Sequence, residues 1–268
     1  MTSKLSIKLS SLFSLSSLSS LLSVATLGLL GACVDQDVAP SEDELAEAQQ
    51  PTICGRTDDA QYVNDYNGTL GPTVTFVQTH KTSKGALASS GVDTSSKYCS
   101  GTLIASNLFL TAGHCVDATS VGDYVAMNYE RAAGSTTLLT QSHYRVDAVL
   151  EDELGGLDYA IVQLAGTPGA TWGIAAVASA DPATGAALTI IGHPEGRPKQ
   201  IEAGTVFGFG TNNIRYNNID TLGGNSGSGV IDASGVVVGV HTNGGCTRRG
   251  GYNYGTRISR IRAVSSIL

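Results

Sequence analysis

Basic residues are scarce in this chain of 268 residues, and they gather nowhere along it. The sequence holds 16 Lys and Arg residues against 23 Asp and Glu residues, which gives a formal net charge of −7. A protein that binds nucleic acid needs clustered cationic side chains to neutralise phosphates. The sequence therefore argues against nucleic acid as a partner.

Long apolar runs, cysteine pairs at metal-ligand spacing and internal repeats are also missing. Serines interrupt the hydrophobic stretch near the N-terminus before about 18 apolar residues accumulate, so a permanent transmembrane helix is not expected. The cysteines include no C-x-x-C pair, which argues against a structural zinc site. We expect the protein to need neither a metal nor another cofactor.

What the chain does contain favours strands and tight turns. Its 33 glycines, its many threonines and valines and its low share of charged residues, 15%, are typical of an all-β protein. Turn residues separate short apolar runs about every 8–12 residues, the spacing of an antiparallel barrel. The runs that we predict to be strands cover residues 73–79, 99–104, 108–112, 124–129, 144–149, 160–164, 188–193, 204–208, 229–232 and 236–241.

The segments between these runs outline the domain. Residues 81–97 are small and polar and predict a surface loop, and residues 166–171 predict a linker between two sets of strands. Apolar residues recur at helical spacing over residues 257–268, so we expect a short amphipathic helix to close the chain. This organisation predicts one barrel over residues 57–166 and a second over residues 172–256.

The first 32 residues have the features of an export signal. Two lysines form a charged start, a Ser- and Leu-rich stretch follows, and residues 30–33 read Leu-Gly-Ala-Cys. That ending resembles a bacterial lipobox, in which the cysteine, here Cys33, is lipidated and anchors the mature protein to a membrane. Plain cleavage after Ala32, which would leave a free thiol and release the protein, is the alternative. Residues 33–56 are acidic and bury little, so we expect a solvated tether or a short propeptide.

Residues 220–229 place Ser226 between glycines, immediately before an apolar run. Glycine accepts positive φ and lets the backbone turn sharply, so such a turn can expose the Ser226 hydroxyl. The amides of Gly224 and Ser226 can converge there on one point, which is the geometry of an oxyanion hole. A glycine-rich hairpin turn is the alternative for this stretch taken alone.

A serine becomes a strong nucleophile only when a base takes its proton and a third group orients the base. His114 follows the apolar run 108–110, and Asp158 stands just before the run 160–164. The chain order His, Asp, Ser is that of the chymotrypsin-type hydrolases and differs from the order in subtilisin and in the α/β-hydrolases. Each residue alone could be structural, but together with Ser226 they predict a catalytic triad.

Residues 99–115, 158–160 and 224–227 look like the three signature segments of the chymotrypsin-clan serine proteases, a likeness that extends over residues 57–262. The resemblance implies an exported serine endopeptidase that acts on proteins or peptides. It also implies the fold: two antiparallel six-stranded Greek-key barrels, with the active site at their seam. One departure is Asn225, because the digestive enzymes carry an aspartate there that pairs with a newly freed N-terminus.

The cysteines other than Cys33 are Cys54, Cys99, Cys115 and Cys246, and four cysteines allow three pairings. In the family that the chain resembles, a disulfide closes the histidine loop, which implies that Cys99 pairs with Cys115. Cys54 and Cys246 are then left to each other. Disulfides in turn fit an exported protein.

At the primary specificity pocket, different residues resemble two different kinds of protease. Residues 223–228 and a downstream Gly-Val-His run are similar to the glutamyl endopeptidases, in which a histidine and a threonine hold the substrate carboxylate. His241 and Thr221 stand at those positions and predict cleavage after Glu. Asp220, six residues before Ser226, stands where trypsin-like enzymes bind Lys or Arg, so trypsin-like cleavage is the alternative. The pocket can accept Glu if Asp220 turns away from it or pairs with His241.

A third interpretation comes from a different class: a binding or adhesion protein on a protease scaffold, with its pocket blocked. The complete triad argues against it. His80, His143 and His193 have no motif around them and are expected at the surface or at strand ends. We assume a monomer.

Overall fold

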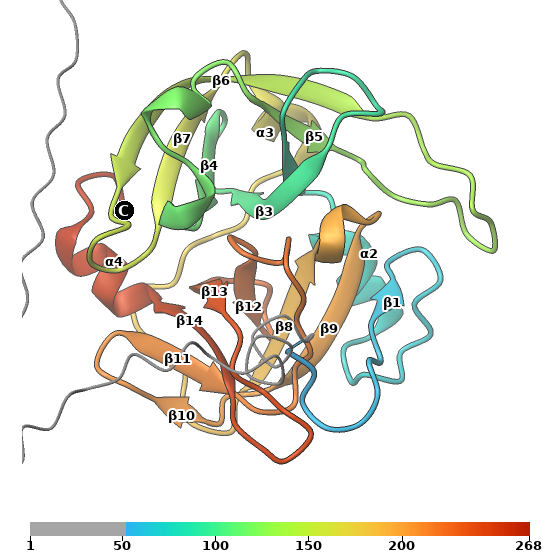
Figure 1. The fold of residues 1–268 in the computed structure, drawn as a ribbon, viewed down its shortest axis with the longest axis vertical. Coiled ribbons are helices and arrows are strands. Elements are labelled where there is room, and N and C mark those ends of the chain that lie inside the picture. Colours follow the sequence, from blue (N-terminus) through green and yellow to red (C-terminus); the bar gives the residue numbers. More distant parts are fainter. Residues whose placement is uncertain (1–51) are drawn as a thin grey trace, which may run out of the picture. The chain divides into compact units, whose positions relative to one another are not determined.

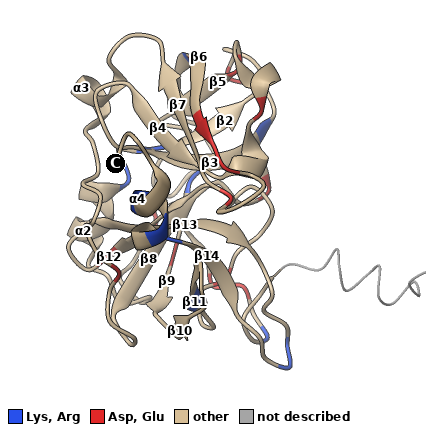
Figure 2. Cartoon of the chain, turned by 90° about the vertical axis from the view of Figure 1, so that its left-hand side faces the viewer, with Lys and Arg blue, Asp and Glu red and all other residues tan. Residues whose placement is uncertain are grey.

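The structure is a computed structural model that describes residues 52–268 (Figure 1). The predicted export signal, Cys33 and most of the acidic segment therefore lie outside the described residues. Within the described part, no helix combines the length and the apolar character needed to cross a membrane. Lys and Arg residues are scattered over several elements rather than gathered on one of them (Figure 2).

Six antiparallel strands close into a barrel in the first half of the chain (Figure 1). Their order around the barrel is β2-β3-β4-β7-β6-β5, so β4 pairs with β7 and not with the next strand in sequence. This kind of crossover is typical of a Greek-key barrel. The strands are β2 (Lys84–Ala88), β3 (Lys97–Leu103), β4 (Leu108–Thr111), β5 (Tyr124–Met127), β6 (Ser142–Asp152) and β7 (Ala160–Leu164).

The first of these strands, β2, lies inside the segment 81–97, for which the prediction of a surface loop is wrong. All of its residues are buried. Three of its five residues are glycine or alanine, and the barrel leaves no room for a side chain at Gly85: a Cβ there would lie 2.7 Å from Val125 Cγ1 and 2.6 Å from Met127 Sδ. Small residues carry little strand signal, so only the packing reveals this strand.

The prediction of a strand at residues 73–79 is also wrong, because this segment forms the helix α2 (Val74–His80). Thr73 caps the helix: its Oγ1 accepts a hydrogen bond from the amide of Phe76 at 3.1 Å. Val77 is the buried residue of the helix, so one helix face is covered rather than alternate residues of a strand. The cap and this burial outweigh the β-propensity of the valines and threonines.

The second half of the chain forms one eight-stranded antiparallel sheet, in the order β1-β9-β8-β12-β13-β14-β11-β10 (Figure 1). Six longer strands make up its centre, and a strand of two residues extends each edge. The strands are β1 (Gln61–Tyr62), β8 (Ala187–Gly192), β9 (Gln200–Thr205), β10 (Gly208–Phe209), β11 (Asn213–Tyr216), β12 (Gly229–Asp232), β13 (Val237–Asn243) and β14 (Asn253–Arg257).

Three features of this sheet differ from the sequence prediction. β1 pairs with β9, so the first described residues belong to the second half and the barrel begins at Lys84 rather than at residue 57. The strand predicted at 204–208 is instead the end of β9 and a break before β10. β11 and β14 carry few apolar residues, so the sequence did not indicate them; they pair with each other.

Short helices occupy the remaining connections. α3 (Pro168–Trp172) lies within the predicted linker, and α4 (Ile258–Val264) packs against β13 and β14 and buries Ile258 and Ile261, as the helical spacing predicted. The 3₁₀ turns are η1 (Gly113–Cys115), η2 (Ala118–Ser120) and η3 (Pro194–Gly196). The predicted fold class is confirmed: a mostly β protein with a closed barrel, a second sheet and a C-terminal helix.

Both disulfides pair as the resemblance implies. Cys99 and Cys115 join β3 to η1, with their Cα atoms 6.1 Å apart. Cys54 and Cys246 join the first described residues to the loop after β13, with their Cα atoms 4.8 Å apart. The disulfides therefore fix both sides of the region in which the predicted site residues lie.

A buried ionic cluster joins the two halves. Glu130, which follows β5, lies 2.6 Å from Lys81 Nζ and 2.9 Å from Lys199 Nζ, and Lys199 directly precedes β9. Glu130 and Lys199 are almost fully buried. Burial raises the pKa of Glu130, but the two lysines outweigh burial and lower it below its usual range. Glu130 is therefore ionised, and it fixes the barrel to the second sheet.

Candidate active site

His114 and Asp158 meet at the ends of two paired strands of the barrel. β4 leads into η1, which carries His114, and Asp158 precedes β7, the neighbour of β4. His114 Nδ1 lies 2.9 Å from Asp158 Oδ2 and 3.0 Å from Oδ1, and the amide of His114 donates to Oδ1 at 2.9 Å. The carboxylate thus fixes both the ring and the backbone of His114, and Nε2 faces away from it.

Asp158 has an uncommon backbone conformation and is kept ionised by its contact with His114. Its φ is 53°, and its amide donates to the carbonyl of Glu153 at 2.9 Å. Burial raises the pKa of Asp158, but hydrogen bonds from the side chain and the backbone of His114 outweigh burial and lower the pKa below its usual range. An ionised Asp158 can stabilise a protonated His114.

Ser226 lies in a turn built from glycines. Gly224 and Gly227 have φ values of +91° and +86°, which glycine adopts without strain. Gly227 has no room for a side chain either, because a Cβ there would lie 2.1 Å from Thr111 Oγ1. The turn that carries Ser226 therefore packs directly on the end of β4, three residues before His114.

Ser100, in β3, holds both sides of this turn. Its amide donates to the carbonyl of Ser226 at 2.8 Å, and its hydroxyl donates to the carbonyl of Gly224 at 2.8 Å. The same hydroxyl accepts a hydrogen bond from the amide of His193 at 2.9 Å. Since β3 belongs to the barrel and His193 follows β8, the turn is anchored from both halves of the fold.

The turn also offers two free donors. Within residues 52–268, the amides of Gly224 and Ser226 donate to no acceptor. The neighbouring carbonyl of Gly223 accepts a hydrogen bond from the amide of Glu195 in η3 at 2.5 Å, which fixes the peptide just before Gly224. Free amides on a fixed backbone are what an oxyanion hole requires.

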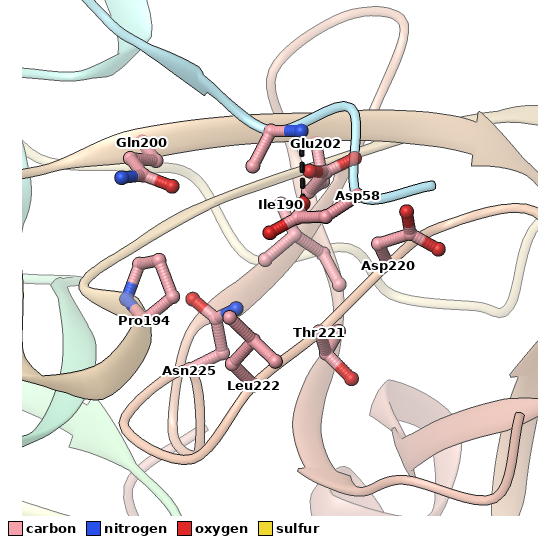
Figure 3. A pocket seen from close by; sticks show the side chains of 10 residues that line it. Asp58, Ile190, Pro194, Gln200, Glu202, Asp220, Thr221, Leu222 and Asn225 are labelled. Atoms are coloured by element: carbon pink, nitrogen blue, oxygen red, sulfur yellow. Dashed lines mark hydrogen bonds between the residues drawn. The ribbon is translucent and has the colours of Figure 1, made fainter. Parts of the chain in front are cut away.

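Asp220 turns toward the N-terminal segment. Its Oδ1 accepts a hydrogen bond from the amide of Cys54 at 2.6 Å, and its side chain lines a small cavity with Asp58 and Glu202 (Figure 3). Burial raises the pKa of Asp220 to about 6; the bond from Cys54 opposes burial, and the charge of Asp59 adds to it. The carboxylate that a trypsin-like pocket would use is thus engaged elsewhere.

His241, in β13, is buried near the His114–Asp158 pair, and its partner is a tyrosine. The hydroxyl of Tyr216 is hydrogen-bonded to His241 Nδ1. Burial and, after it, the charge of His114 lower the pKa of His241 to about 3, against the opposing charge of Asp158. The imidazole of His241 is therefore neutral at physiological pH in the free protein.

Thr221 is buried beside the first residue that the structure describes. Its hydroxyl lies 2.8 Å from Thr52 Oγ1, and Thr52 Oγ1 donates to the carbonyl of Thr221 at 2.5 Å. Thr52 and Thr221 also form an isolated β-bridge. The predicted specificity threonine is thus in contact with the segment just before Cys54.

Four residues of the site were not found from the sequence: Ser100, Tyr216, Thr52 and His193. His193 was expected at the surface or at a strand end; it follows β8, but it is buried, and its ring stacks on Tyr129 with the centroids 5.9 Å apart. Burial holds the pKa of His193 well below its usual range. Ser100 lies within the signature segment 99–115, but its role, like that of the other three residues, depends on contacts with segments distant in sequence, which no motif reveals.

Comparisons with known proteins agree with this architecture. Residues 99–240, more than half of the chain, match the trypsin-like peptidase domain. The chain is similar to a solved Glu endopeptidase in complex with MPD, with a TM-score of 0.57 and 25% identity over 77% of this chain and 94% of that chain. It shares the fold of the serine endoprotease from Yersinia pestis, with a TM-score of 0.54 and 16% identity over 70% of this chain and 63% of that chain.

A curated relative is the extracellular metalloprotease of Bacillus subtilis (strain 168), 30% identical over 183 residues, which are 62% of this chain and 56% of that protein. The chain thus spans little more than half the length of this relative. The relative's name implies a metal, and the candidate donors beside the triad residues are Cys99, His114 and Cys115. Both sulfur atoms are joined in a disulfide and cannot act as ligands, so these residues do not fit a metal centre.

Proposed function

The chain belongs to the trypsin-like peptidase family and is a serine endopeptidase, and on that premise we propose that Ser226, His114 and Asp158 form its catalytic triad. The observation that carries the proposal is the two-point contact of Asp158 with His114, beside the glycine turn of Ser226. In the proposed mechanism, Ser226 Oγ attacks the scissile carbonyl while His114 Nε2 takes its proton. His114 then donates a proton to the leaving amine, and the acyl-enzyme is hydrolysed by water in the same way.

Asp158 and the free amides have electrostatic roles in this mechanism. Asp158 keeps the proton of neutral His114 on Nδ1 and stabilises the imidazolium as it forms, without itself becoming protonated. The amides of Gly224 and Ser226 receive the oxyanion of the tetrahedral intermediate, and each such donor contributes about 3–4 kcal/mol to transition-state stabilisation. These steps use only side chains and backbone amides of the chain.

We propose that the enzyme cleaves after Glu. Asp220 supports this because its carboxylate is engaged by Cys54 and faces other carboxylates, so it is poorly placed to bind Lys or Arg. His241 offers a buried donor in its stead, and Thr221 lies buried at the position that the resemblance assigns to the specificity threonine. The similarity to a Glu endopeptidase supports the same conclusion.

The test of this specificity compares two peptides that differ only at the residue before the scissile bond. We expect kcat/KM for the Glu peptide to exceed that for the Arg peptide by at least about 100-fold, because a site of buried donors without an available carboxylate rejects a cation. The measurement uses steady-state hydrolysis of both peptides by one preparation. A preference for Arg would contradict cleavage after Glu.

We also propose that the protein is exported and anchored through Cys33. Disulfides form and persist in oxidising compartments, and the chain contains two. The Leu-Gly-Ala-Cys sequence at residues 30–33 supports lipidation, with residues 33–56 as a tether or a propeptide before the protease domain at 57–268.

If Cys33 is lipidated, the membrane fraction of expressing cells should contain a mature protein that begins at an acylated Cys33. Intact mass spectrometry and the mass of the N-terminal peptide should both show the added acyl chains. A Cys33→Ala variant, which cannot be acylated, should appear without them. A soluble wild-type product with Cys33 removed or free would contradict the anchor.

A further inference from the structure

A cluster of carboxylates lies beside the loop that leads to Ser226 and includes Asp58, Glu202 and Asp220 (Figure 3). Carboxylate oxygens of Asp58, Glu202 and Asp220 lie within 4.8 Å of one another. The three residues come from separate parts of the chain: the N-terminal segment, β9 and the loop before Ser226. Together they line a cavity of about 10 Å³, which is room for one water-sized sphere.

Glu202 has an oxygen that the protein leaves without a partner. Its side chain is 4% exposed, and Oε1 is buried with no hydrogen-bond donor in reach. A buried acceptor of this kind costs free energy unless something outside the chain satisfies it. Glu202 also lines the cavity, so its carboxyl group borders the space that a small ligand would fill.

The charge around this oxygen is uniformly negative. Within residues 52–268, no salt bridge reaches Asp58, Asp59, Glu202 or Asp220. Burial, together with the charges of Asp59, Asp220 and Asp58, raises the pKa of Glu202 to about 10. In the absence of a cation, the cluster therefore keeps a proton on Glu202 at neutral pH.

We propose that Asp58, Glu202 and Asp220 bind one hard divalent cation, which we assign as Ca²⁺. Carboxylate oxygens are the ligands that such cations prefer, and Ca²⁺ takes about six to eight oxygens in flexible geometry. The side-chain amides of Gln200 and Asn225 line the same cavity and can add ligands. This site is separate from the triad and does not depend on the proposed specificity.

Such a cation would connect three segments of the chain directly through their carboxylates. It would bond the N-terminal segment at Asp58 to β9 at Glu202 and to the loop at Asp220. Asp220 precedes Thr221 and already accepts a hydrogen bond from Cys54. The bound cation thus stabilises the folded protein and fixes the backbone that leads to Ser226.

The test measures the thermal midpoint of the full chain with Ser226→Ala, which prevents self-digestion, in EDTA and in about 10 mM CaCl₂. Extracellular calcium sites have Kd values of about 10⁻⁴ M, so this concentration should raise the midpoint by roughly 5–10 °C. Titration calorimetry with CaCl₂ on the EDTA-treated protein should show one site that is lost on Glu202→Gln. MgCl₂ should have a smaller effect, because Mg²⁺ demands near-octahedral geometry and retains its water.

The variant Glu202→Gln keeps the shape of the side chain and removes the carboxyl group that would bind the cation. In EDTA it should melt at or above the midpoint of the parent, which shows that it folds, and CaCl₂ should no longer shift it. The matched control is Asp147→Asn, an exposed carboxylate of β6 paired with Arg145, which should retain the full calcium shift. An equal shift in Glu202→Gln, or no calcium binding by the parent protein, would overturn the proposal.

Discussion

Replacing Ser226 by alanine is expected to lower kcat on a peptide substrate by about a millionfold and to abolish labelling by a fluorophosphonate probe. The probe forms a bond with an activated serine oxygen, and alanine has none. His114→Ala should reduce both signals nearly as far, because triad members act as a unit and the loss of either one removes the activated nucleophile. Hydrolysis by purified protein and labelling detected on a gel provide the measurements.

The control for this experiment is Ser228→Ala, a serine two residues along the same turn. Within the described chain its hydroxyl has no hydrogen-bond partner, so its removal should leave labelling intact. Undiminished labelling of the Ser226→Ala protein would show that another residue is the nucleophile. A folded wild-type protein that does not react would support the alternative of a silent binding protein on this scaffold.

The second large effect concerns specificity: His241→Ala should lower kcat/KM for the Glu peptide by about 100-fold. A substrate carboxylate buried in the pocket would lose a donor and remain unpaired, which accounts for this size of effect. Asp220→Asn should change the same rate by less than about threefold, because its carboxylate accepts a hydrogen bond from Cys54 and lies beside Asp58 and Glu202. Both variants should be assayed on the matched Glu and Arg peptides.

The Arg peptide serves as the internal control in this comparison. Under the proposal its slow hydrolysis changes little in either variant. A fast Arg reaction that is lost in Asp220→Asn would show that Asp220, and not His241, sets the specificity. Loss of both reactions in His241→Ala would indicate damage to the Ser226 turn, since the carbonyl of His241 accepts a hydrogen bond from the amide of Gly227.

The protonation state of His241 sharpens the proposal about the pocket. An imidazolium would bind a substrate carboxylate more strongly than a neutral ring, but in the free protein the pKa of His241 is lowered to about 3. A carboxylate placed beside the ring would favour the charged form and raise that pKa. Tyr216, whose own pKa lies well above its usual value because of burial, keeps its hydroxyl proton and supports Nδ1.

The parts of the site that could be predicted are those written into short stretches of sequence. Ser226 stands among glycines whose positive φ values the turn requires, and His114 stands beside Cys115 at the end of an apolar run. The disulfide of Cys115 with Cys99 followed from the resemblance to the chymotrypsin-clan proteases. Local chemistry and chain order were sufficient to predict the roles of these residues.

The orientation of Asp220 could not be predicted in this way. Whether it faces the pocket depends on the amide of Cys54 and on the carboxylate of Glu202, which are distant in sequence. Ser100 is similar, because its role depends on contacts with residues more than 90 positions away. Tertiary packing also determines that residues 84–88 form the strand β2. Its glycine and alanines carry no strand signal in the sequence, but they fit inside the barrel.

The disulfide between Cys54 and Cys246 determines how any internal cut in this protein would look on a gel. A cut between these cysteines leaves both fragments covalently joined, so the nicked chain migrates as one band until a reductant is added. A cut before Cys54 instead releases the segment that precedes it, with or without reductant. Electrophoresis of the same sample with and without reductant therefore distinguishes removal of the N-terminal segment from self-digestion within the domain.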